Sequence, residues 1–336
     1  MSPSKQFTRL LFPLFLFMVV TSCRFPSSQP EATPSPSPSP TIVPTAAPAP
    51  RTLTVCLGEE PNTLYPFGAP NAAARSVLAA VNDGPIDMIG YDYQPVILTK
   101  LPSLENGDAE IVKIPVQVGD QIVDADGNLV LLEEGVRVHP AECRDDGCVI
   151  TYDGTTTLEM DQMVVTFRLR PDLTWADGTP LTTDDSIYAF KLASDPSAVA
   201  NSYLIERTQT YEAADAQTIQ WWGKPGFMDP TYFTNFWAPA PKHLWSQFPA
   251  NQLNTIDIAS RSPIGWGAYK IEDWISGDHI TLTKNPYYFR AVDGDPKFDI
   301  LTFRFTPDPN MALSELVAGR CDILDPSINL DGQAGL

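Results

Sequence analysis

Residues 166–196 constrain the fold most, because the hydrophobic period changes twice within this one short stretch. Apolar and polar residues alternate over residues 163–170, which predicts a strand with one buried face. Pro171 ends this alternation. Asp177-Gly178 then predicts a turn, since glycine adopts positive φ without a steric penalty.

A helix is predicted to begin directly after Thr182. Thr182 and Asp185 have the spacing of a capping box, in which the two residues satisfy each other's free backbone N–H groups. Five apolar residues then follow the three-and-four spacing of a helix that buries one stripe. They are Ile187, Tyr188, Phe190, Leu192 and Ala193. A second helix-like run, within residues 72–89, leads into Asn82-Asp83-Gly84. Strand, turn and helix together predict an α/β domain and carry no chemistry of their own.

Ten positions of the central stretch resemble the signature of the extracellular solute-binding proteins of family five. These proteins are the peptide, dipeptide and nickel receptors of ABC importers. The shared pattern is F-x-L-R-x-x-x-x-W-x-D-G-x-x-L-T-x-D-D, beginning at Phe167. Residues 263–270 resemble the second signature of the family, P-x-G-T-G-P-Y, from which Trp266 and Ala268 depart. The resemblance covers about residues 53–325.

The resemblance implies an α/β fold, namely lobe one of a type II periplasmic-binding-protein-like (cluster C) structure. Lobe one is expected over residues 51–325, with a mixed core sheet from 51–86 and 256–325 and a β-rich inserted subdomain at 87–255. Residues 326–336 are expected to be the stub of the crossover to a second lobe that is largely missing. A ligand would then contact only one lobe, so we expect weak binding and an exposed apolar surface.

The function implied by the resemblance is capture of an oligopeptide, dipeptide or related small solute for an ABC permease and ATPase complex. It implies no cofactor and no catalysis. The chain has no nucleophile elbow, HExxH, Walker loop, GxGxxG or paired CxxC motif, but a secreted lipid-anchored hydrolase and a non-transporting solute sensor remain alternatives. The net charge of −19 argues against nucleic acid as a partner.

Four residues are expected to contact the ligand, on the basis of the family's cleft segments. Trp266 stands beside two glycines, so its ring either packs in the core or faces the cleft. The four candidates are Asn71, Tyr188, Trp266 and Asp325.

The N-terminus is predicted to be an export signal. A basic start precedes an apolar run at residues 10–20, and residues 20–23 resemble a bacterial lipobox ending in Cys23. Lipid on Cys23 would anchor the exported chain to the outer face of the cell membrane, in the periplasmic space of a two-membrane cell. The alternative is an ordinary cleavage site with an incidental cysteine. Residues 24–50 are rich in Pro, Ser and Ala, which predicts a disordered tether.

The other four cysteines are predicted to form two disulfides. Cys143 and Cys148 bracket a turn and are close enough in sequence to pair in a hairpin. Zinc bound by His139 and these two cysteines is the alternative, although no fourth ligand is evident, so no metal is expected. The family resemblance implies a second bridge between Cys56 and Cys321, on strands of the same sheet.

Overall fold

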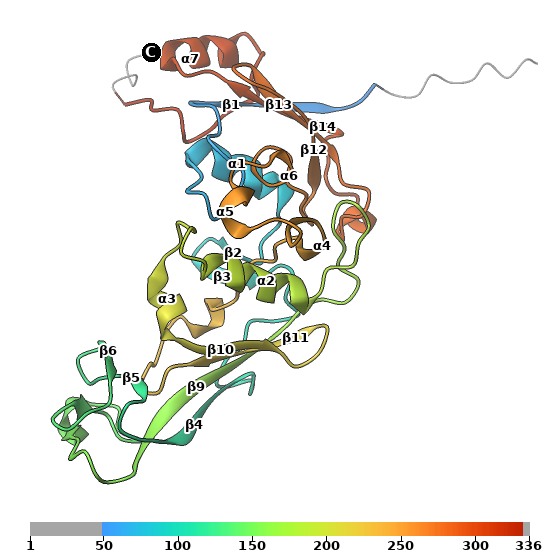
Figure 1. Cartoon of the computed structure of the whole chain (residues 1–336). Coiled ribbons are helices and arrows are strands. Elements are labelled where there is room, and N and C mark those ends of the chain that lie inside the picture. Colours follow the sequence, from blue (N-terminus) through green and yellow to red (C-terminus); the bar gives the residue numbers. More distant parts are fainter. Residues whose placement is uncertain (1–48, 332–336) are drawn as a thin grey trace, which may run out of the picture. The chain divides into compact units, whose positions relative to one another are not determined.

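The computed structural model describes residues 49–331. The predicted signal peptide, the lipidation residue Cys23 and nearly all of the predicted tether therefore lie outside the described residues. A five-stranded mixed sheet brings together the two ends of the described chain (Figure 1). Its strands in spatial order are β12 (Tyr269–Ile275), β13 (His279–Lys284), β14 (Ile300–Phe305), β1 (Thr52–Leu57) and β15 (Ile323–Leu324). β1 is parallel to β14 and β15, whereas β13 is antiparallel to its two neighbours, β12 and β14.

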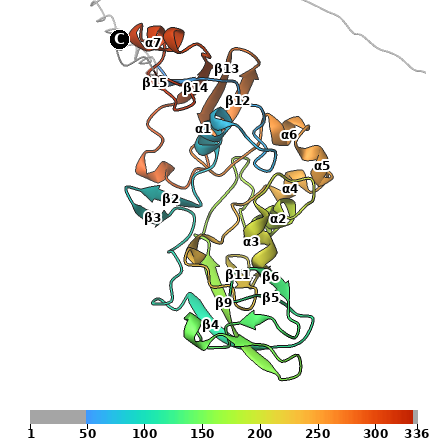
Figure 2. The same ribbon diagram turned by 90° about the vertical axis from the view of Figure 1, so that its left-hand side faces the viewer.

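Helices cover both faces of this sheet, as Figures 1 and 2 show. Successive side chains of a strand point to opposite faces, so neighbouring residues of β1 enter different cores. Leu57 packs in the core that contains α1 (Ala72–Val81), and Cys56 packs in the core that contains α7 (Pro309–Val317). The mixed sheet expected from the family resemblance is confirmed.

A second, antiparallel sheet consists of four strands. Their spatial order is β10 (Thr208–Ala213), β11 (Thr218–Gly223), β9 (Leu158–Arg168) and β4 (Ala109–Val116). The strand predicted at 163–170 overlaps the end of β9. Its one buried face is confirmed over residues 165–170, where Val165, Phe167 and Leu169 are buried and Arg168 and Arg170 are exposed, whereas Val164 departs from the pattern because it is buried as well. Earlier in β9, a loop after β11 covers the strand, with Gly226 N donating to Asp161 O at 2.8 Å.

Three small hairpins extend from the sheets. They are β2 (Ile86–Ile89) with β3 (Asp92–Pro95), β5 (Gln121–Val123) with β6 (Leu129–Leu131), and β7 (Arg137–Val138) with β8 (Ile150–Thr151). The helix-like run predicted within residues 72–89 ends at Val81, directly before Asn82-Asp83-Gly84, and residues 86–89 form β2. Gly84 has a φ of 81°, and Pro85 lacks a backbone N–H, so the helix cannot continue into β2.

The helix of the central stretch is α2 (Thr183–Ala193), whose predicted capping box is confirmed. Thr182 N donates to Asp185 Oδ2 at 3.0 Å. The predicted buried stripe is partly wrong. Leu192 and Ala193 are buried, but the other buried residues of α2 are Thr183, Asp185, Ser186 and Ala189, because the polar members of this face have hydrogen-bond partners in neighbouring loops.

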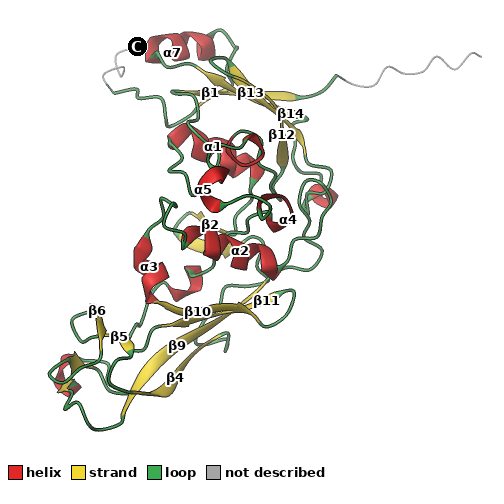
Figure 3. Ribbon diagram, viewed as in Figure 1, coloured by secondary structure: helices red, strands yellow, loops and turns green. Residues whose placement is uncertain are grey.

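The remaining helical segments are short, as the red segments of Figure 3 show. They are α3 (Ser202–Arg207), α4 (Lys242–Trp245), α5 (Ala250–Leu253) and α6 (Asp257–Ser260), with single turns at η1 (Asp146–Cys148), η2 (Tyr232–Thr234) and η3 (Ala291–Asp293). None of the helices found in residues 49–331 has the length and apolar character needed to cross a membrane.

Candidate functional site

A cavity of about 480 Å³ lies beside the C-terminal half of α1, and we call it the α1 cavity. Residues far apart in the sequence line it. They are residues 66–67, Arg75, Leu78 and Ala79 of α1, residues 82–84, Asp87, residues 237–240 and Trp266. The volume is that of a site for a small molecule or for one or two side chains of a larger ligand.

Three aromatic side chains, Phe67, Trp237 and Trp266, line the α1 cavity. The Trp237 ring packs against Phe190 and Tyr211, with ring centroids 4.6 and 4.7 Å apart. The indole N–H of Trp266 donates to Asp83 O at 2.8 Å. Both tryptophans are therefore held in place by neighbours, and the cavity is preformed.

Asp83 and Asp87 make one end of the α1 cavity acidic. Asp83 Oδ2 accepts a hydrogen bond from Tyr288 Oη at 2.6 Å and lies 3.3 Å from Arg290 Nη1. The Asp87 carboxylate has no hydrogen bond or ion pair to any other residue within 49–331. Burial, and then the charge of Asp83, raise the pKa of Asp87 above its usual value, while Arg290 opposes the shift.

Arg75 lies on α1 at a distance from the acidic end. Its guanidinium is exposed, and Nη1 donates to Pro70 O at 2.8 Å. A helix rises about 1.5 Å per residue, so Arg75 is roughly 10 Å along α1 from Asn82. The positive charge is thus at the rim of the α1 cavity, away from Asp87.

The two stretches that carry the family resemblance support the lining of this cavity. Gly265 and Gly267 pack directly on the end of α1: an added Cβ would lie 2.0 Å and 2.6 Å, respectively, from Val81 O. Gly267 N donates to that same oxygen at 2.7 Å, and Ala176 N donates to Gly265 O at 2.9 Å. Only glycine allows so close an approach, and the contact places Trp266 against the α1 cavity.

Asp185 of α2 supports another lining segment of the cavity, residues 237–240. Its Oδ1 accepts from Lys242 N at 3.2 Å, and its backbone oxygen accepts from Ala240 N at 3.1 Å. Trp175 Nε1 donates to Asp185 Oδ2 at 3.3 Å. Burial raises the pKa of Asp185, although these hydrogen bonds oppose the shift. Asp185 thereby ties the lining segment 237–240 to α2.

The structure does not bring the four predicted ligand residues together. Only Trp266 lines the α1 cavity, and its ring is also part of the core, with 2% of its surface exposed. Asn71 caps α1 by accepting from Ala74 N at 2.9 Å, and Tyr188 packs in a cluster around Tyr65.

Asp325, the fourth predicted ligand residue, lies at the edge of the five-stranded sheet. It is buried, and its carboxylate accepts a hydrogen bond from Ser327 N at 2.8 Å. Sequence reasoning missed Asp83, Asp87 and Trp237. The acidic turn after α1 and the aromatic, proline-rich run at 231–245 were the signals that could have indicated them.

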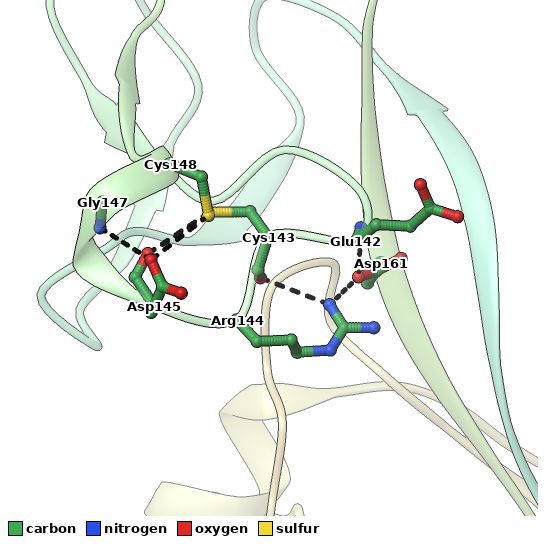
Figure 4. Close-up of a disulfide and its surroundings, with 7 residues drawn as sticks. All are labelled: Glu142, Cys143, Arg144, Asp145, Gly147, Cys148 and Asp161. Carbon is green, nitrogen blue, oxygen red and sulfur yellow. Dashed lines mark hydrogen bonds and ion pairs between the residues drawn. A yellow bond between two sulfur atoms is a disulfide. The ribbon is translucent and has the colours of Figure 1, made fainter.

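The structure joins Cys143 to Cys148, with Cα atoms 5.7 Å apart (Figure 4). Nearby, Arg144 pairs with Asp161 and holds the loop against β9. A disulfide leaves neither sulfur as a thiolate, and residues 49–331 contain no group of three His, Cys, Asp or Glu side chains placed to hold a metal. The geometry therefore favours the bridge over the zinc alternative with His139.

Cys56 and Cys321 are also joined, with Cα atoms 5.8 Å apart. Cys56 lies on β1, as expected. Cys321 does not lie on a strand, because it precedes β15 by two residues in the turn after α7. The bridge therefore links the sheet to the end of this helix.

Comparison with known proteins identifies the family. Residues 154–334, more than half of the chain, match the family described as "Bacterial extracellular solute-binding proteins, family 5 Middle". The chain is 28% identical over 161 residues to the oligopeptide-binding protein AppA of Bacillus subtilis, covering 45% of this chain and 28% of AppA. It is 23% identical over 187 residues to a probable ABC transporter-binding protein of Deinococcus radiodurans, covering 51% of this chain and 32% of that protein.

Solved structures show the same fold. The AppA structure from Bacillus subtilis, in complex with a nonapeptide, matches with a TM-score of 0.57 and 18% identity, over 81% of this chain and 44% of AppA. An oligopeptide-binding protein from Thermus thermophilus, complexed with a pentapeptide, matches with a TM-score of 0.57 and 16% sequence identity, over 80% of this chain and 43% of that chain. The chain thus spans less than half the length of these proteins. The chain belongs to the bacterial extracellular solute-binding proteins, family 5.

Proposed function

We propose that this chain captures a peptide or a related small solute outside the cell and delivers it to the permease and ATPase of an ABC importer. Membership of the solute-binding family supports the proposal, as do the peptides in the two solved structures. The observation that carries it is the preformed α1 cavity, because both family stretches position residues that line it.

The α1 cavity suits a receptor because most of its lining residues are apolar, so a ligand can pack there without matching many hydrogen-bonding groups. Aromatic rings that neighbouring residues already hold lose little conformational entropy when a ligand packs on them. The side chain of a bound peptide would pack between Trp237 and Trp266, while its backbone remained outside. Such a site accepts side chains of different shapes, which a peptide receptor requires.

Fluorescence titration of the full chain tests this proposal. Trp237 and Trp266 line the cavity, so a ligand there changes the emission of both. We expect saturable changes with short peptides and a Kd of about 0.1 to 1 mM, because the cavity is open and holds only part of a peptide. A linear, non-saturating response to every peptide up to about 10 mM would contradict the proposal.

We also propose that Cys23 is lipid-modified and becomes the first residue of the mature protein. The apolar run before residues 20–23 and their likeness to a lipobox support this proposal. Cells expressing the chain should incorporate labelled palmitate into it, and a Cys23→Ala variant should not. Incorporation that persists in the variant would refute the proposal.

A further inference from the structure

We propose that the acidic end of the α1 cavity binds a cationic group of the solute, such as a lysine or arginine side chain, with Asp87 as its counter-ion. This inference rests on the proposed function and names the class of solute that the site prefers.

The balance of charge is the first argument. Asp83, Asp87 and Arg290 are the charged groups at this end, and Tyr288 faces them as a neutral phenol whose pKa is raised by burial and by its hydrogen bond to Asp83. Arg290 lies 3.3 Å from Asp83 and cannot neutralise two carboxylates. One negative charge therefore remains, and Asp87 is the carboxylate that lacks a hydrogen-bond or ion-pair partner within the described part of the chain.

The aromatic lining is the second argument. The electron-rich faces of tryptophan and phenylalanine attract cations, and the attraction is larger where water is partly excluded. Phe67, Trp237 and Trp266 line the same cavity as Asp87, and two of the rings are held by ring packing and a hydrogen bond. Aromatic rings together with a half-buried carboxylate form a site for an ammonium or guanidinium group.

Arg75 does not change this preference at the acidic end. It is exposed, hydrogen-bonded to Pro70 O, and about 10 Å away along α1. At physiological salt a charge at that distance through water is largely screened.

Three blocked tripeptides provide the test, since acetyl and amide ends leave only the central side chain charged. They are Ala-Lys-Ala, Ala-norleucine-Ala and Ala-Glu-Ala. For the full chain we expect the lysine peptide to bind about five- to tenfold more tightly than its norleucine analogue, and the glutamate peptide most weakly. Raising the salt concentration from about 0.05 to 0.5 M should reduce the lysine advantage and leave norleucine binding unchanged.

The Asp87→Asn variant should abolish the lysine advantage, so that it binds the lysine and norleucine peptides with similar Kd values. Asp92→Asn, at an exposed acid of the adjoining strand β3, is the matched control and should keep the advantage. Circular dichroism of both variants checks folding, and the salt series on the unmodified chain gives an answer even if Asp87→Asn is unstable. Equal binding of lysine and norleucine peptides overturns this inference alone, whereas no binding of any peptide overturns the proposed function with it.

Discussion

Trp266 shows what a single residue in a sequence can and cannot reveal. A large ring between two glycines indicates a position where the backbone makes a close contact, but the sequence does not identify the residue that it contacts. The structure shows that the partner is Val81 O, more than 180 residues earlier in the chain, and that the ring lies in the core and also lines the α1 cavity. Neither contact could be derived from local sequence, because both depend on where the end of α1 lies.

Comparing Trp266 with Trp222 tests how much the contacts of Trp266 contribute to stability. The Trp266 N–H has a partner at 2.8 Å, whereas the buried N–H of Trp222 has no hydrogen-bond partner among residues 49–331. Trp266→Phe replaces the buried indole with a smaller ring and removes the N–H that pairs with Asp83 O, so it should lower the free energy of unfolding by about 2 to 3 kcal/mol. Trp222→Phe removes an unsatisfied donor and should cost less than about 1 kcal/mol.

Urea denaturation of the two variants and the unmodified chain measures the difference. Unchanged m-values would show that the variants differ in stability and not in the extent of unfolding. Equal losses of stability for both variants would show that the hydrogen bond to Asp83 O and the packing of Trp266 add no stability beyond that of the unpaired Trp222.

At the scale of elements, the signals that are local in sequence predicted structure well. The capping box of α2 was recognised because its two residues lie three positions apart, and the structure contains it. Burial was predicted less well. Asp185 and Ser186 are buried on α2 because residues 237–242 supply hydrogen bonds. Residues 160–164 of β9 are all buried, and the loops at 142–144 and 224–226 hydrogen-bond to Asp161 there. A strand or helix does not encode which distant loop will cover it.

At the scale of the whole molecule, the family resemblance predicted the mixed sheet, which pairs β1 with strands about 250 residues away. Periodicity alone could not have made that connection. The resemblance did not predict the candidate site equally well, since Trp266 alone among the four named residues lines the α1 cavity. Ligand contacts in a permissive receptor come from loops and helix ends, where sequence patterns are weakest.

The central claim is that the α1 cavity is where this family member holds its solute. Calorimetric titration of the lysine peptide into the full chain and an Ala79→Trp variant tests it most directly. Ala79 is an exposed residue of α1 that lines the cavity, so the added indole should fill the space without disturbing the core. Ala213→Trp, at an exposed position of β10, is the control for adding a tryptophan elsewhere. We predict at least a tenfold weaker Kd for Ala79→Trp and an unchanged Kd for Ala213→Trp. An unchanged Kd for Ala79→Trp would show that the solute binds elsewhere.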